Sequence, residues 1–176
     1  ARGANDYFTD YKILPNPPVV KRPPTGDNWR AERQDNEAEI EVMRKVVRKR
    51  LENRGLQQQA VVTDEALNVM AKMSGGVMRD LIRLFSDAAT SAQALKRERI
   101  DKETALKAVY KHRREMSARM TVVHRGALVD VLKEGCLKNG NQTEVEDDLV
   151  KALYLLSYQS GDDTWFDAHP NLLPVL

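Results

Sequence analysis

The chain has 176 residues, of which 41% are hydrophobic, 31% charged and 6% aromatic, and its formal net charge is +2. This composition, rich in Ala, Leu, Glu, Lys and Arg, is typical of a globular protein with a helical bias. A single cysteine excludes an internal disulfide and fits a reducing compartment. No apolar run approaches the roughly 20 residues of a membrane span, and no signal-peptide pattern opens the sequence. We therefore expect a cytoplasmic protein without a membrane partner.

Residues 1–34 lack helical periodicity and contain five prolines between positions 15 and 24. Proline fixes φ and removes a backbone donor, so the stretch from Leu14 to Thr25 is predicted to be extended. Four apolar side chains could dock this stretch against a neighbouring surface: Ile13, Leu14, Val19 and Val20. Because the sequence begins at Ala1 with neither a Met nor a folding element, we expect it to be a piece of a longer protein.

Four amphipathic helices are predicted within residues 35–120. Apolar residues recur with the 3.6-residue period over 36–53, 63–74, 77–96 and 101–120. Thr63 and Asp101 are the predicted N-caps, and Gly55 is a predicted terminator. On the first helix, acidic residues gather at the N-terminal end and basic residues at the other, which favours a solvated, dipole-matched face over a nucleic-acid patch. Short connections favour one compact helical bundle.

A second, smaller unit is predicted over residues 121–176. A helix over 122–134 ends at Gly135, and Thr143 with Glu146 forms a capping box that opens another helix. The runs 155–159 and 164–168 flank Ser160-Gly161-Asp162-Asp163, a pattern typical of a β-hairpin. Residues 153–156 fit either a helix or a strand. Helix, helix and hairpin together have the outline of a winged helix.

One short motif indicates an anion-binding position. Gly75 and Gly76 interrupt the chain directly before the helix over 77–96, and Arg79 lies in the first turn of that helix. A cation at a helix N-terminus opposes the helix dipole and costs about 0.3–1 kcal/mol. An anion docked there would reverse this balance, since Arg79 and the free N–H groups would both bind it. The alternative is that Asp80 neutralises Arg79 and that both are ordinary surface residues.

The stretch Gly76-Val77-Met78-Arg79, at the third of four predicted helices, resembles the sensor-2 motif of AAA+ ATPases. The order of elements is similar to that of the initiator clade and of the related STAND-type ATPases. In those proteins a proline-containing link leads from the core into a helical lid, and a winged-helix-like domain follows. The resemblance covers Ile13 to Leu176, and Trp165-Phe166-Asp167-Ala168-His169-Pro170 is similar to the ending of one bacterial group.

The resemblance implies a mainly α fold with three parts. Residues 1–34 would be an extended, proline-rich linker from an ATPase core that is missing here. Residues 35–120 would be a four-helix lid, and residues 121–176 a winged-helix-like domain with a C-terminal β-hairpin.

The resemblance also implies site residues and a cofactor. The sensor-2 arginine of that family reaches the γ-phosphate held by the core, a role carried here to Arg79. Arg83, one turn later, is the second candidate, and Gly76 opens the motif. ATP and Mg²⁺ would be bound through the missing core only.

The sequence offers no candidate for catalysis by these residues alone. It contains no phosphate-loop motif, so we expect this chain to bind no nucleotide by itself and not to be an enzyme, although the parent protein would be an ATPase. Three histidines are dispersed without metal-ligand spacing, and no metal site is predicted: His112, His124 and His169.

Three functions remain open. The first is a nucleotide-sensing lid whose partners are its own ATPase core and, through the C-terminal unit, other proteins or subunits. The second is a DNA-binding winged helix, which is disfavoured because residues 121–176 hold four basic and nine acidic residues, a net charge of −5. The third is a protein-interaction scaffold without a nucleotide role, in which Arg79 would be idle.

Overall fold

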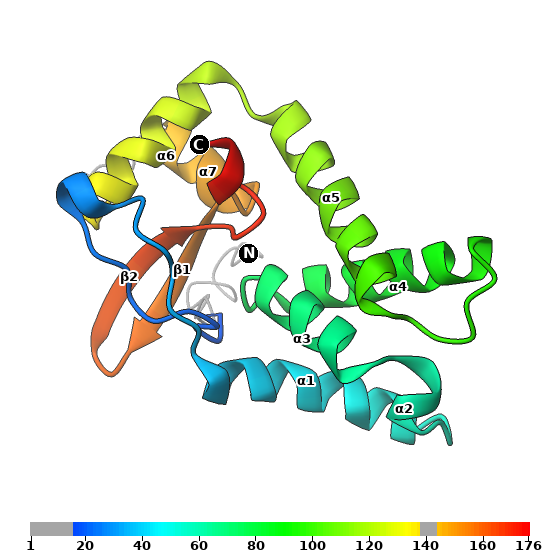
Figure 1. Ribbon diagram of the computed structural model, residues 1–176. Coiled ribbons are helices and arrows are strands. Elements are labelled where there is room, and N and C mark those ends of the chain that lie inside the picture. Colours follow the sequence, from blue (N-terminus) through cyan, green and yellow to red (C-terminus); the bar gives the residue numbers. More distant parts are fainter. Residues whose placement is uncertain (1–15, 138–143) are drawn as a thin grey trace, which may run out of the picture.

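The computed structural model describes residues 16–137 and 144–176 (Figure 1). These residues form seven α-helices and one C-terminal antiparallel hairpin, which confirms the predicted mainly α fold with a terminal hairpin. No helix in this part of the chain is both long and apolar enough to cross a membrane. The helices are α1 Glu37–Glu52, α2 Gln58–Val61, α3 Asp64–Met73, α4 Met78–Ala94, α5 Lys102–Arg119, α6 Val122–Glu134 and α7 Glu144–Lys151. The hairpin strands are β1 Leu155–Ser160 and β2 Asp163–Ala168.

The capping signals in the sequence correspond to the observed helix ends. The side chains of Thr63 and Asp101 accept backbone N–H groups at 3.2 Å and 2.9 Å, so both predicted N-caps are confirmed. Gly135 ends α6 with a left-handed φ of 75°, as predicted from its lack of a Cβ atom. The capping box predicted at Thr143 falls outside the described residues, and α7 begins at Glu144.

The ambiguous segment 153–156 becomes a tight turn followed by a strand. Helix α7 ends at Lys151, and Leu153 has a left-handed φ of 57°, which takes the chain out of the helix. Leu155 and Leu156 then begin β1 and are both buried, on opposite faces of the hairpin. Helix α2 was not predicted, because four residues are too few to show a helical period.

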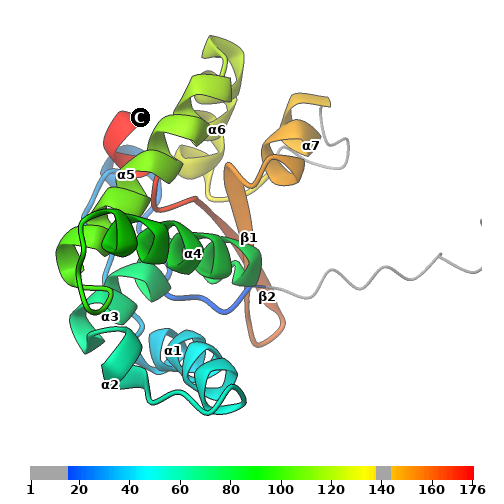
Figure 2. The same ribbon diagram turned by 90° about the vertical axis from the view of Figure 1, so that its right-hand side faces the viewer.

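The hairpin, drawn in orange in Figures 1 and 2, contributes residues to two hydrophobic cores. On one face, Tyr158 and Trp165 join the core built by α1, α3, α4 and α5. On the other face, Leu155 and Ala168 join a second core with α6, α7 and the C-terminal segment. The register pairs Tyr158 with Trp165 and Leu155 with Ala168, so each pair occupies one face. The hairpin is therefore the element that connects the two sets of helices.

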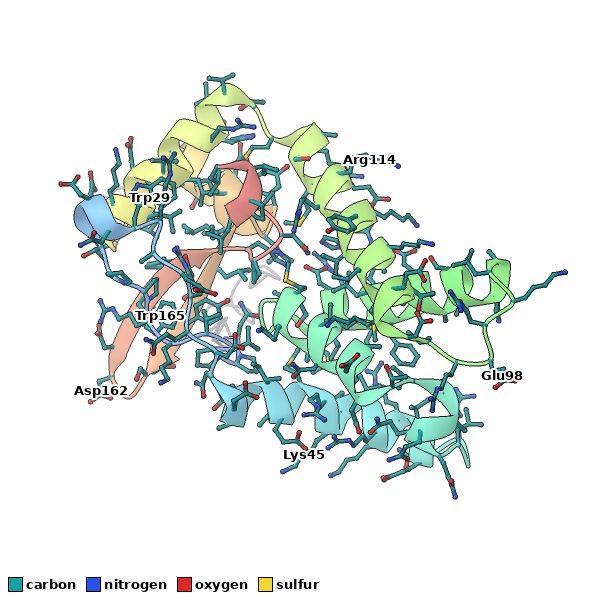
Figure 3. The ribbon with its side chains drawn as sticks, viewed as in Figure 1. Trp29, Lys45, Glu98, Arg114, Asp162 and Trp165 are labelled. Carbon is teal, nitrogen blue, oxygen red and sulfur yellow. The ribbon has the colours of Figure 1, made fainter. Side chains whose placement is uncertain are left out.

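The segment 16–35 runs along the hairpin and contributes to both cores. Asn16 forms a parallel bridge with Tyr158, and Val19 is completely buried in the first core. Trp29 follows the short 3₁₀ turn Gly26–Asn28 and packs in the second core, as Figure 3 shows near α6. The apolar residues of this predicted linker thus have a docking surface within the chain itself.

Two ion pairs tie this segment to β2, and they differ in burial. Arg33 contacts the Asp167 carboxylate twice, at 3.1 Å through Nε and at 2.7 Å through a terminal nitrogen. Their side chains are only 8% and 2% exposed. Arg22 pairs with Asp163 nearer to the hairpin tip, where both side chains are more than half exposed.

Loss of the Arg33 side chain is predicted to destabilise the fold much more than loss of Arg22. In Arg33→Ala the Asp167 carboxylate would stay buried without its cation, which costs about 3–5 kcal/mol. Arg22→Ala removes an exposed pair worth about 0–1 kcal/mol. Urea denaturation of both variants measures the two free energies of unfolding. Equal losses in the two variants would show that the buried pair is not an anchor.

Candidate functional site

The turn before α4 brings three parts of the chain together. Gly75 and Gly76 both have left-handed φ values, of 63° and 79°. A Cβ atom on Gly76 would lie 2.0 Å from the carbonyl oxygen of Pro17, and one on Gly75 would lie 2.5 Å from a methyl group of Leu156. The buried Tyr158 hydroxyl donates a 2.9 Å hydrogen bond to the Gly75 carbonyl. Burial raises the pKa of Tyr158 well above its ordinary value, so this donor keeps its proton.

A basic pocket opens beside the first two turns of α4. Arg79 and Arg83, the two arginines predicted to bind an anion, both line it. The Arg79 side chain is 77% exposed, whereas Arg83 pairs with Glu115 of α5. Arg119 at the end of α5 and Lys151 at the end of α7 also line the pocket. Three helices therefore bring four basic side chains to one place.

The pocket suits a small anionic group. Its volume of about 210 Å³ is below the roughly 300–1,000 Å³ of pockets that enclose drug-sized ligands. Its four Arg and Lys side chains outnumber its two carboxylates, Asp80 and Glu115. Guanidinium groups recognise phosphate and carboxylate oxygens through parallel N–H donors. Gly76 is buried in the preceding turn, so its contribution is to set the position of Arg79.

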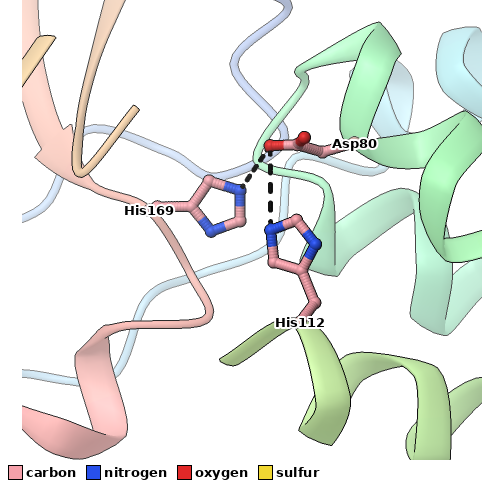
Figure 4. A group of neighbouring side chains, drawn as sticks. All are labelled: Asp80, His112 and His169. Carbon is pink, nitrogen blue, oxygen red and sulfur yellow. Dashed lines mark ion pairs between the residues drawn. The ribbon is translucent and has the colours of Figure 1, made fainter. Parts of the chain in front are cut away.

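A buried cluster of one carboxylate and two imidazoles adjoins the pocket (Figure 4). Asp80 Oδ2, in α4, lies 3.4 Å from His169 Nε2 and 4.0 Å from Nε2 of His112 in α5. The two imidazole rings are stacked, with centroids 5.6 Å apart. The nearest approach of Arg79 to the other Asp80 oxygen is 3.9 Å. Asp80 is 4% exposed, so it is not the surface residue that the alternative prediction assumed.

Burial and charge set the protonation states in this cluster. Burial alone would raise the pKa of Asp80, but the adjacent imidazole of His169, with His112 and Arg79, brings that pKa below its ordinary value. Burial lowers the pKa of His112, and the nearby Asp80 carboxylate opposes this effect only in part. At neutral pH Asp80 is therefore ionised and His112 is neutral.

The hydrogen bonding of His169 defines its tautomer. The backbone N–H of Asn171 donates to Nδ1 at 3.2 Å, so in a neutral ring the proton lies on Nε2, which faces Asp80. This Nε2–Oδ2 contact is close but not aligned as a hydrogen bond, and within the described residues His112 Nδ1 also has no hydrogen-bond partner. One ligand atom from each of the three side chains lies within 4.8 Å of the other two, a spacing that one metal ion could span.

Sequence patterns could not assemble this cluster. Asp80 lies in α4, His112 in α5 and His169 in the segment after β2, so their positions in the sequence show no ligand spacing. One signal did exist, because His112 lies three residues after Val109 and four before Met116. Helical periodicity therefore places it on the buried side of α5. Arg119 and Lys151 carried no comparable signal.

Comparisons of the chain with family models, with curated proteins and with solved structures find no match.

Gly76→Ala is predicted to destabilise the chain by about 2–4 kcal/mol. The new Cβ would collide with a backbone carbonyl that cannot move without its segment, and the left-handed φ adds strain. Gly126→Ala is the control, because Gly126 lies in α6 with nothing near its Cβ position. That change should stabilise the helix by about 0.5–1 kcal/mol. Thermal unfolding of the two variants should therefore shift in opposite directions, and a Gly76→Ala variant as stable as the original would refute the close approach of Pro17.

Proposed function

We propose that this chain is the nucleotide-sensing lid and C-terminal interaction module of a larger AAA+ ATPase. Arg79 contacts the γ-phosphate of ATP bound by a core outside these residues, and Arg83 is the second phosphate contact. The observation that carries the proposal is the basic pocket, in which Arg119 and Lys151 accompany these two arginines. Like charges gathered at one place repel each other, and a bound anion removes that repulsion.

The size of the pocket supports contact with phosphate groups and not with a whole nucleotide. Its volume of about 210 Å³ leaves no room for a base and ribose as well as a triphosphate. The sequence also lacks a phosphate loop. In this proposal the core binds the base, the ribose and Mg²⁺, and the lid adds cations to the terminal phosphate.

The proposal assigns the lid to residues 35–120 and a winged-helix-like unit to residues 121–176. Helices α1, α3, α4 and α5 share the first core, which supports one bundle with α4 as its third main helix. Helices α6 and α7 followed by the hairpin have the element order of a winged helix. Residues 1–34 are the link to the core.

The lining of the pocket offers a physical route from nucleotide to partner. Arg79, Arg83 and Arg119 belong to the lid, whereas Lys151 belongs to the C-terminal unit. An anion attracts all four cations, so its binding favours arrangements in which α7 and α4 are close. Hydrolysis and phosphate release remove that attraction. The C-terminal unit, which binds protein partners, would thereby respond to the nucleotide state.

In the longer protein that includes the ATPase core, Arg79→Ala should lower kcat for ATP hydrolysis by about a hundredfold. Removing one positioned cation from a site of developing charge typically has an effect of this size. The variant should keep its thermal midpoint, because an exposed first-turn arginine contributes little to stability. Steady-state hydrolysis and thermal unfolding of the same preparation measure the two effects.

Arg114→Ala is the matched control, since Arg114 is an exposed arginine on α5 outside the pocket (Figure 3). It should leave hydrolysis unchanged, and Arg83→Ala should have a smaller effect than Arg79→Ala. If Arg79→Ala changes neither hydrolysis nor nucleotide-dependent partner binding, the sensor-2 assignment fails and the scaffold function becomes the better proposal.

The DNA-binding alternative has less support from the surface charges. On α1, Arg44 and Arg48 both pair with Glu41, and Arg44 also lies 3.4 Å from Asp64. These two arginines are thus already partnered by carboxylates within the chain. At the hairpin tip, Asp162 would face an approaching phosphate backbone (Figure 3).

The chain is therefore predicted not to bind duplex DNA at micromolar concentrations. Fluorescence anisotropy with a labelled duplex at two salt concentrations tests this, because phosphate contacts weaken steeply with salt. Salt-dependent binding that is lost on mutation within residues 121–176 would favour a winged-helix DNA reader. Binding that is lost when Arg44, Lys45, Arg48 and Lys49 are replaced by alanine would instead assign DNA recognition to α1.

A further inference from the structure

The buried cluster of Asp80, His112 and His169 has no part in the proposed recognition of phosphate. Its side chains come from the first turn of α4, the middle of α5 and the segment after β2, and they are 5%, 2% and 0% exposed. Each offers one ligand atom, and the three atoms lie within 4.8 Å of one another. Burying a carboxylate and two imidazoles costs free energy unless they gain partners that compensate for the lost water.

The distances in the cluster are close to those of a metal site. Tetrahedral zinc with bonds of about 2.0–2.1 Å separates its ligand atoms by about 3.3–3.4 Å. Asp80 Oδ2 lies 3.4 Å from His169 Nε2 and 4.0 Å from His112 Nε2. The ligand atoms of the two imidazoles lie within 4.8 Å of each other, so side-chain adjustments of about 1 Å would bring all three ligand atoms to coordination distance.

An unsatisfied nitrogen is a second and independent indication. His169 Nε2, the ligand atom nearest to Asp80 Oδ2, is buried and has no hydrogen-bond partner within the described residues. Buried polar atoms are nearly always partnered, so such an atom points to a missing ligand or water. A metal ion coordinated through Nε2 would give this nitrogen its partner.

The hydrogen bond that His169 Nδ1 accepts lowers the affinity of the site for a metal ion by a modest factor. Coordination through Nε2 moves the ring proton to Nδ1, and the hydrogen bond from the Asn171 backbone N–H to that atom is then lost. Losing one such bond lowers affinity by about ten- to a hundredfold. Micromolar affinity remains within reach of a three-ligand zinc site after that loss.

We propose that Asp80, His112 and His169 bind one divalent transition-metal ion, with zinc as the expected occupant. Two imidazole ligands favour zinc and its neighbours over Mg²⁺ and Ca²⁺, which prefer oxygen ligands. Asp80 and His112 also line the basic pocket, so a water molecule can reach a fourth coordination position from that side. The ion joins the segment after β2 to α4 and α5.

The chain freed of metal with EDTA and carrying no histidine tag is titrated with Zn²⁺ by calorimetry. One equivalent should bind with a Kd at or below about 1 µM, and the thermal midpoint should rise by several degrees. Co²⁺ should give the intense visible absorption of a tetrahedral site. Asp80→Asn and His169→Gln should each weaken zinc binding at least about a hundredfold.

His124→Gln is the control, since His124 is the third histidine of the sequence and lies on α6 outside the cluster. It should bind zinc as the original chain does. Histidine side-chain NMR of the original chain reports coordination without any substitution, and His112 and His169 should shift while His124 does not. The proposal is overturned if the metal-free chain binds no zinc below about 100 µM. It is also overturned if zinc shifts the NMR signals of His124 and not those of His112 and His169. Folded Asp80→Asn and His169→Gln variants that bind zinc as tightly as the original chain would likewise overturn it. In that case the cluster is a structural contact that packs the segment after β2 against α4 and α5.

Discussion

The hydrogen bond from the Tyr158 hydroxyl to the Gly75 carbonyl is the contact on which the arrangement of the two cores depends. Its donor belongs to the hairpin and its acceptor to the turn before α4, 83 residues away. Because Gly75 and Gly76 lack Cβ atoms, the hairpin on one side and Pro17 on the other approach this turn more closely than a side chain would allow. The start of α4 is therefore held from two directions.

Two consecutive residues in the first turn of α4 then meet opposite environments. Arg79 is exposed in the basic pocket, whereas Asp80 is buried against two histidines. Successive side chains on an α-helix point about 100° apart, so a helix with a fixed start can present a cation outward and a carboxylate inward. Asp80 also lies where the helix dipole favours negative charge, which offsets the unfavourable placement of Arg79. The pocket and the histidine cluster thus share one structural origin.

Local signals in the sequence were sufficient for the long helices, the hairpin and part of the site. Capping residues and apolar periods predicted the long helices, and Ser160-Gly161-Asp162-Asp163 predicted the hairpin, since both depend on neighbouring residues. The pairing of Arg33 with Asp167 and the meeting of His112 with His169 depend on how distant segments pack, which no local pattern encodes. Arg79 was recognisable because a cation is unusual at a helix start, whereas Arg119 and Lys151 look like ordinary surface residues until the helices converge.

The anchoring of segment 16–35 to β2 has a consequence for synthesis on the ribosome. Arg33 and its partner on β2 are separated by 134 residues, so at about 5–20 residues per second the partner is made roughly 7–27 s later. During that interval Val19 and Trp29, which end up buried, have no hairpin to cover them. The prolines of this segment keep it extended before the hairpin is made, and they remove backbone N–H donors. The segment is therefore a weak template for β-pairing with other nascent chains.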